Sequence, residues 1–295
     1  MNRVRVPDQR AIVDRRALAE TVAEAARHDD PREGRRAVVA ALREALEQGR
    51  GELARRLAAR PSAGHEITAG HSFLVDQLIR VIHGHVTSAV YPAGNRSTGE
   101  RLAIMAVGGY GRAEMAPHSD VDIAFLVGEK RNAWAEQVVE AMLYLLWDLG
   151  LKVGHSTRSL DEMIRLARGD LTIRTAMLEG RYVWGDQDLY EEGAARFQAE
   201  VVRGNERAFV SEKLEERNAR HKRMGDSRYV VEPNIKDGKG GLRDLHTLYW
   251  IGKFIHRVRS AADLVGVGLL TSAEYRSFRR AEGFLLAVRC HLHTL

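Results

Sequence analysis

The stretch Val107-Gly-Gly-Tyr-Gly-Arg-Ala-Glu-Met-Ala-Pro-His-Ser-Asp-Val-Asp-Ile-Ala-Phe-Leu-Val127 is the most informative part of the chain. It sets a glycine turn shortly before two aspartates that alternate with apolar residues. Positions i and i+2 of a strand project from one face, so Asp120 and Asp122 should point the same way, about 6.5 Å apart at Cα. Val121 and Ile123 would then face a core. Two carboxylates this close can share Mg²⁺ with a triphosphate, as phosphoryl and nucleotidyl transfer require.

The residues before the aspartates favour the same chemistry. A short buried strand is predicted over residues 102–107. Gly108 and Gly109 then allow a tight turn and let backbone N–H groups approach phosphate oxygens without a Cβ in the way. Residues 110–115 are expected to start a short helix whose N-terminus faces the same anion. Arg112 would lie near enough either to pair with a phosphate or to brace the loop.

The spacing makes this combination specific. A Gly-Gly turn is by itself more often a plain loop, and Asp-x-Asp at a strand end is more often solvated. Here ten residues separate the glycine pair from Asp120. This pattern resembles the signature of the DNA polymerase β-like nucleotidyltransferase superfamily. The resemblance implies an α+β fold with a small mixed β-sheet core flanked by helices, in which Asp120 and Asp122 are catalytic and bind Mg²⁺.

A second motif comprises Glu232-Pro-Asn-Ile-Lys236 and Gly240-Gly-Leu-Arg-Asp-Leu-His246. Pro233 and three glycines prevent a regular helix or a central strand in this loop. Lys236 and Arg243 make it basic, and a helix is predicted from residue 242 onward. A basic glycine loop that opens a helix suits a phosphate or an acidic partner, although in isolation a solvated surface turn is the more common use.

Together the two motifs resemble hallmarks of the bacterial PII uridylyltransferase/uridylyl-removing enzymes. Gly154-His-Ser-Thr-Arg158 and Leu178-Glu-Gly-Arg181 resemble intervening blocks of that family, so the resemblance covers about residues 70–295. It implies transfer of UMP from UTP to a tyrosine of the PII nitrogen-regulatory protein, with Mg²⁺ as cofactor and pyrophosphate as the product released. The substrate-binding residues it implies are Gly108, Gly109, Arg112, Ser119, Lys236 and Arg243.

Several residues keep two interpretations. Ser119 either hydrogen-bonds a phosphate or caps the strand. The superfamily usually has a third carboxylate on a neighbouring strand, but the strand expected here carries His155 and no acid; Asp170 or Glu179 could reach the site from a helix. His155 is either a base or a buried structural histidine. One charged helix is expected to carry five cations, some near the triphosphate and most in solvent. They are Lys213, Arg217, Arg220, Lys222 and Arg223.

Hydrophobic periodicity divides the chain into three parts. Residues 1–70 form an N-terminal helical segment, with a helical hairpin over residues 11–60 broken near Gly49-Arg-Gly51. Residues 71–185 form the nucleotidyltransferase core, with helices over 72–90, 133–149 and 161–182 and a strand over 151–157. Residues 186–295 form a helical nucleotide- or partner-binding domain, interrupted only by the basic loop. The pattern over 272–295 reaches the last residue without a terminating signal, which predicts a piece of a longer protein.

Composition narrows the possible partners. Lysine and arginine (45) exceed aspartate and glutamate (40) by 5, which favours anionic ligands. No dense basic run interleaved with aromatics occurs, so nucleic acid is not expected. The single cysteine, Cys290, excludes an internal disulfide and fits a reducing compartment. No apolar run has the length of a membrane span, and the N-terminus has no secretory signal, so we expect a cytoplasmic protein without a membrane partner.

Two alternatives to PII uridylylation remain open at this stage. The first is an adenylyltransferase or another nucleotidyltransferase that acts on a different protein or small molecule. The second is a non-catalytic nucleotide-binding module. The resembled family continues with a metal-dependent phosphohydrolase domain of the HD type and ligand-sensing ACT domains. Because this chain has no such His-Asp pair, the uridylyl-removing and glutamine-sensing parts are expected to be absent from it.

Overall fold

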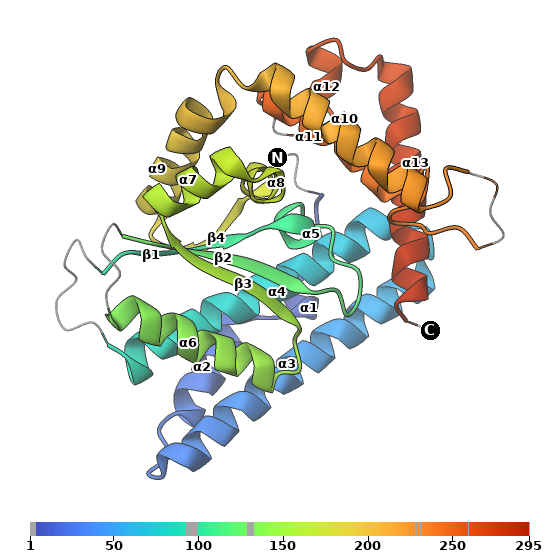
Figure 1. The fold of residues 1–295 in the computed structure, drawn as a ribbon. Coiled ribbons are helices and arrows are strands. Elements are labelled where there is room, and N and C mark those ends of the chain that lie inside the picture. The colour runs from blue at the N-terminus through green and yellow to red at the C-terminus, as the bar shows by residue number, and fades with distance from the viewer. Residues whose placement is uncertain are drawn as a thin grey trace.

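The computed structural model describes residues 4–92, 100–128, 133–227, 229, 232–258 and 260–294. Helices cover both faces of one four-stranded sheet (Figure 1). Strand β2 is antiparallel to β1 and parallel to β3, and β4 is antiparallel to β1. The predicted α+β class with a small mixed sheet is therefore confirmed. In the spatial order β3-β2-β1-β4, the strands are Val153–Ser159, Val121–Val127, Leu102–Ala106 and Arg181–Gly185.

The two central strands are buried on both faces. Ile104 and Ile123 belong to a hydrophobic cluster formed with the N-terminal helices. Ala103 and Leu126 belong to a second cluster formed with the helices that follow β3. Because side chains alternate along a strand, Asp122 shares the face of Leu126 and points toward this second layer of helices.

The first layer comes mainly from the N-terminal part of the chain. Its members pack around the cluster that contains Ile104 and Ile123. They are α1 (Gln9–Ile12), α2 (Arg15–Ala25), α3 (Pro31–Ala59), α4 (Gly64–His85) with a π-helical extension (Val86–Val90), and α6 (Ala133–Asp148).

The predicted break of α3 near Gly49 is wrong, because the helix continues through it. A Cβ on Gly49 would lie 2.7 Å from a δ-carbon of Leu74 on α4 and 2.9 Å from the carbonyl oxygen of Ile12 on α1. Gly49 therefore serves the close packing of α3 against its neighbours and does not mark a turn. A Cβ on Gly51 would meet nothing within 4 Å.

The second layer follows β3. Its helices are α7 (Leu160–Gly169), α8 (Leu171–Glu179), α9 (Gln187–Phe197) with a π-helical extension (Gln198–Val202), α10 (Glu206–Arg223), α11 (Leu242–His256), α12 (Asp263–Gly266) and α13 (Ser272–Leu292). The C-terminal helix α13 also packs along α4 of the first layer. Phe254 of α11 shares a cluster with Leu126 of the sheet, so the sheet and the C-terminal helices have a common core. The domain boundaries expected near residues 70 and 186 stay predictions.

The helical assignment up to residue 182 is wrong at its end. Gly180 ends α8 with an extended backbone (ψ 129°), and the chain then enters β4. Tyr182, Val183 and Trp184 are residue types that favour strands, and β4 pairs with β1. The pairing partner lies about 80 residues earlier in the chain, so local periodicity did not reveal it. Among the described helices, none is both long and apolar enough to cross a membrane.

Substitution of the two α3 glycines should have opposite effects on stability. Gly49→Ala should lower the free energy of unfolding by about 1–3 kcal/mol, because the new methyl group overpacks the contacts with Leu74 and Ile12. Gly51→Ala should raise it by up to about 1 kcal/mol, since alanine favours a helix and the site is open. Urea unfolding measures both; equal effects at the two positions would contradict the continuous, closely packed α3.

Candidate functional site

A cavity of about 650 Å³ lies between the sheet and the second layer of helices. This volume is within the range of small-molecule sites. The cavity is lined by the glycine turn after β1, the start of β2, the beginning of β3 and side chains from α8, α10, α11 and α13. All the residues that the sequence singled out as site residues are in its lining: Gly108, Gly109, Arg112, Ser119, Asp120, Asp122, Lys236 and Arg243.

The glycine turn forms a shorter and earlier helix than expected. Helix α5 spans only Gly108–Gly111 instead of residues 110–115. Gly108 has a φ of 59°, a left-handed conformation that favours glycine. The N–H of Val107 donates to the carbonyl oxygen of Asp122 (3.0 Å), which holds the turn against β2.

The carboxylate of Asp122 lies between two glycines. A Cβ on Gly108 would lie 3.0 Å from one of its oxygens, and a Cβ on Gly154 of β3 would lie 2.5 Å from the other. Any larger residue at position 154 would therefore displace the carboxylate. Gly154 is part of the Gly154–Arg158 block noted in the sequence, but its contact with Asp122 depends on the parallel pairing of β2 and β3.

The electrostatics of the two aspartates suit a bound cation. Burial raises the pKa of Asp122, and repulsion by the Asp120 carboxylate raises it further. Within the described part of the chain, neither carboxylate has a hydrogen bond or an ion pair with a side chain. A divalent cation held by both would relieve the repulsion. No group of three or more His, Cys, Asp or Glu among the described residues could hold a metal, so phosphate oxygens or water would have to complete its coordination.

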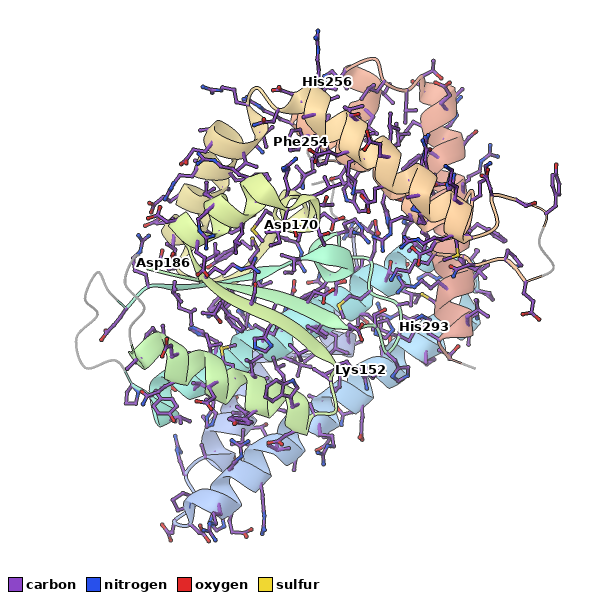
Figure 2. The ribbon with its side chains drawn as sticks, viewed as in Figure 1. Lys152, Asp170, Asp186, Phe254, His256 and His293 are labelled. Carbon is purple, nitrogen blue, oxygen red and sulfur yellow. The ribbon has the colours of Figure 1, made fainter. Side chains whose placement is uncertain are left out.

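The two candidates for a third carboxylate are both engaged elsewhere. Asp170 lies between α7 and α8 (Figure 2), where its carboxylate accepts the N–H of Ile173 (2.8 Å) and caps α8. It is not in the cavity lining. Glu179 does line the cavity, but its carboxylate is bound by the guanidinium of Arg112 and by Nε1 of Trp250. The sequence had no signal for these contacts.

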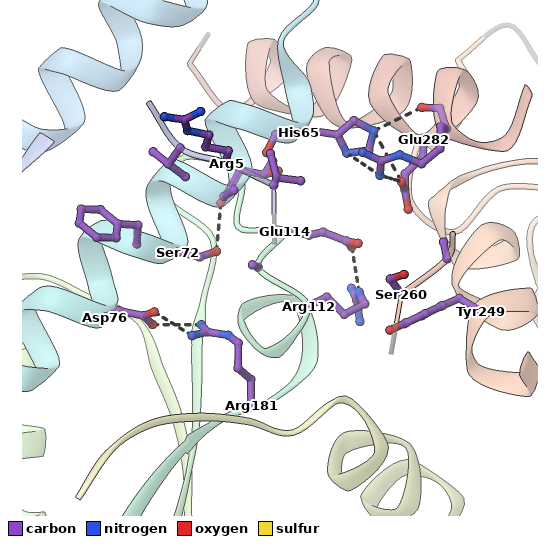
Figure 3. Close-up of a pocket in the computed structure, with 18 of the residues that line it drawn as sticks. Arg5, His65, Ser72, Asp76, Arg112, Glu114, Arg181, Tyr249, Ser260 and Glu282 are labelled. Atoms are coloured by element: carbon purple, nitrogen blue, oxygen red, sulfur yellow. Dashed lines mark hydrogen bonds and ion pairs between the residues drawn. The ribbon is translucent and has the colours of Figure 1, made fainter. Parts of the chain in front are cut away.

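Arg112 braces the turn from behind (Figure 3). Its guanidinium donates to Glu114 (2.8 Å) as well as to Glu179, and the side chain is only 8% exposed. Glu114 in turn lies 2.8 Å from Nε2 of His246 on α11. These contacts favour the bracing interpretation of Arg112 over direct pairing with a phosphate. They also join the second sequence motif to the first.

Lys236 is the cation most available to a ligand. The residue is exposed, although its ammonium group is partly desolvated, and within the described residues this group has no hydrogen bond or ion pair. Burial lowers its pKa, as do the neighbouring Arg243 and Arg289. Arg243 makes a 3.4 Å contact with Asp237. Arg289 of α13, which the sequence did not reveal, donates to the hydroxyl of Ser119 (3.4 Å) and also lines the cavity.

Helix α10 contributes two buried cations. The side chain of Lys213 is 3% exposed, and its Nζ lies 4.1 Å from the ring centre of Trp250. Arg220 is buried and pairs with Asp244. By contrast, Lys222 is exposed, as expected for most of the charged helix. Burial lowers the pKa of Lys213.

The buried structural interpretation of His155 is wrong. The residue is exposed on β3, and its ring lies edge-on to Trp147, with 6.1 Å between ring centres. It is among the residues that line the cavity, but its register partner is Ile123, so its side chain lies on the face of the sheet opposite Asp122. Because β3 is an edge strand, this position is accessible from solvent. The role of His155 as a base stays a prediction.

A second cavity of about 400 Å³ lies behind Arg112 and Glu114 (Figure 3). Glu282 of α13 lies in its wall, where its carboxylate is bound by Arg279 (2.6 Å) and lies 3.5 Å from His65. Burial raises the pKa of Glu282 to about 7, and the nearby Glu114 contributes to the rise. The wall of this second cavity thus includes a carboxyl group that is about half-protonated at neutral pH.

The raised pKa of Glu282 should make stability depend on pH. Its folded pKa of about 7 lies above the ordinary 4.5, so the stabilisation is complete below pH 4.5 and is lost as the pH rises through 7. Glu282→Gln should flatten this decline, by up to about 1.4 kcal/mol per pH unit. Unfolding measured between pH 5 and 8 would detect the change. The exposed Glu47→Gln should keep the wild-type profile; an unchanged profile in Glu282→Gln would contradict the raised pKa.

Comparison with known proteins identifies the family. Residues 208–295 match the family described as GlnD PII-uridylyltransferase. Over 99% of its length, the chain is 69% identical to the bifunctional uridylyltransferase/uridylyl-removing enzyme of Novosphingobium aromaticivorans, 67% to that of Erythrobacter litoralis and 53% to that of Rhodospirillum rubrum. It spans 32%, 32% and 31% of these relatives, about a third of their length. The chain therefore belongs to the family of bifunctional uridylyltransferase/uridylyl-removing enzymes.

Proposed function

We propose that this chain is a Mg²⁺-dependent nucleotidyltransferase that moves UMP from UTP to a tyrosine of the PII protein and releases pyrophosphate. The observation that carries the proposal is the pair Asp120 and Asp122, which face a nucleotide-sized cavity without a cationic partner among the described residues. The names of the relatives support uridylyl transfer, and the description of the matching family supports PII as the acceptor.

In this proposal, the chain's own groups bind and orient the nucleotide. Backbone N–H groups at Gly108 and Gly109 hold phosphate oxygens, because no Cβ obstructs their approach. Lys236 and Arg243, which line the same cavity, neutralise the charge of the triphosphate. Asp120 and Asp122 would hold Mg²⁺, which neutralises phosphate charge and lowers the pKa of the attacking hydroxyl when bound.

Two features of the cavity keep this arrangement rigid. The ion pairs of Arg112 with Glu114 and Glu179 prevent the glycine turn from relaxing toward the aspartates. The close fit of Gly154 against Asp122 limits the rotation of its carboxylate. A site that is preorganised in this way does not need to reorganise as charge develops on the transferred phosphate.

Removal of either metal-binding carboxylate should abolish transfer. Asp120→Asn and Asp122→Asn should each lower the rate of UMP transfer to PII by at least about 100-fold. The remaining carboxylate alone would hold the cation that neutralises the phosphate charge too weakly. Transfer of label from α-labelled UTP in the presence of Mg²⁺ measures this effect.

The matched control is Asp170→Asn, which lies outside the cavity and should keep the activity. Wild-type rates in both cavity variants would refute the metal role. Labelling of the acceptor by ATP and not by UTP would replace uridylyl transfer with adenylyl transfer, while binding of UTP without any transfer would favour a nucleotide-binding module.

Loss of the Lys236 ammonium group should weaken nucleotide binding specifically. Lys236→Ala should raise the KM for UTP about tenfold or more, since a hydrogen bond to a charged group contributes about 1.5–3 kcal/mol. Its melting temperature should stay unchanged, because no contact within the described residues depends on the ammonium group. The exposed Lys222→Ala should leave the KM unchanged; equal KM values for the two variants would remove Lys236 from the site.

A further inference from the structure

A groove of about 600 Å³ lies outside the candidate catalytic cavity and shares no lining residue with it. It is formed by α2, by the C-terminal part of α4 with its π-helical extension, and by Trp184 of β4. Strands β3 and β4 are the two edges of the sheet, so the groove beside β4 lies at the edge opposite His155. All the residues that line it are described.

The groove is positively charged and carries no compensating acid. Its lining includes four arginines and a histidine but no Asp or Glu: Arg15, Arg16, Arg27, Arg80 and His85. Within the described residues, none of these four guanidinium groups has a carboxylate partner. The Nε of Arg80 donates to the carbonyl oxygen of Val183 (3.2 Å). Burial lowers the pKa of Arg80.

The carboxylate of Asp76 is already bound by other residues and does not pair with the arginines of the groove. Asp76 lies one turn before Arg80 on α4, but its two oxygens are bound by Arg181 (2.7 and 3.0 Å), and one of them also by the hydroxyl of Tyr110 (2.6 Å). Other surface arginines do form ion pairs with acids. Arg35, for example, lies 2.6 Å from the carboxylate of Asp148. The lining of the groove thus carries charge of one sign, although Glu20 and Glu24 occur elsewhere on α2.

An indole ring holds two of the guanidinium groups in place. The ring centre of Trp184 lies 5.6 Å from Cζ of Arg15 and 5.3 Å from Cζ of Arg80. A guanidinium over an aromatic ring keeps its in-plane N–H donors free, and those donors match the oxygens of a phosphate. The side chain of Trp184 is 37% exposed, so a ligand in the groove can touch it.

The floor of the groove is apolar and built from small side chains. Its members are Ala19, Val22, Ala23, Ala26, Val81, Gly84 and Ala89. A simple inorganic anion would leave this floor uncovered, whereas a compact hydrocarbon or aromatic body would pack on it. The arginines and the aliphatic floor together suit a ligand that has both an anionic group and an apolar body.

We propose that this groove is a second ligand site, which binds a small organic phosphate with its phosphate against Arg15 and Arg80 and its apolar body on the alanine-rich floor. The site is independent of the proposed transferase activity, because it uses none of the residues that line the catalytic cavity.

Phenyl phosphate is a suitable probe for calorimetric titration, with inorganic phosphate and phenol as its separate halves. We expect saturable binding of phenyl phosphate that is at least tenfold tighter than binding of either half. Arg15→Gln, at a half-buried position, should weaken it at least fivefold without a change in melting temperature, whereas Arg27→Gln, at an exposed position away from Trp184, should weaken it less. Arg55→Gln, at an exposed arginine of α3 that pairs with Glu52, is the matched control and should bind as the wild type does.

Tryptophan fluorescence locates the bound probe. Phenyl phosphate should change the emission of the wild type, and Trp184→Phe should lose that change. Lys236→Ala should retain both binding and the fluorescence change, which separates this groove from the catalytic cavity. Absence of saturable binding, unchanged affinity in Arg15→Gln, or loss of binding in Lys236→Ala would each overturn the proposal. Binding of polyglutamate but not of phenyl phosphate would overturn it too, in favour of an acidic protein surface.

Discussion

Repulsion between the carboxylates of Asp120 and Asp122 is the constraint on which the site depends. The pKa of Asp122 is raised first by its burial and then by the like charge of Asp120, which the fold holds beside it. The fold can do so because β2 is central in the sheet, where pairing with β1 and β3 restrains its backbone. The glycines on both sides of Asp122 leave the carboxylate just enough room. A cation or a proton bound between the two carboxylates would offset the repulsion.

The buried ion pairs behind the glycine turn have a positional role. Arg112 lies between Glu114 and Glu179, and His246 and Trp250 of α11 contact the same two acids. Burial of such charges contributes little net stability, but removal of one partner would leave the other uncompensated. The network therefore resists any change that would move α11 away from the turn. In this way the motif around residue 243 and the motif around residue 108, far apart in the chain, form one wall.

The two surfaces that suit anions differ in what surrounds their cations. In the candidate catalytic cavity, Lys213 and Arg220 are buried and paired with acids, which leaves Lys236 as the ammonium without a partner among the described residues. In the groove beside Trp184, the lining has no acid at all, and an aromatic ring takes the place of a counter-ion. The first arrangement surrounds the cavity with many fixed charges, whereas the second has cations without acids in its lining at the edge of the sheet.

The sequence predicted the mixed α+β class through the resemblance of its motifs. It located the strand that carries the aspartates and the glycine turn before it, because these depend on the two-residue period of a strand and on short spacings along the chain. It also singled out part of the cavity lining from the two motifs, including Asp120, Asp122 and Lys236. Tertiary structure decided the rest: that Gly49 packs a continuous α3, that β4 joins β1, that Glu179 is held by Arg112, and that Arg289 reaches Ser119 across 170 positions. Each of these features is a contact between residues that are far apart in the sequence, and such contacts form only when the chain packs.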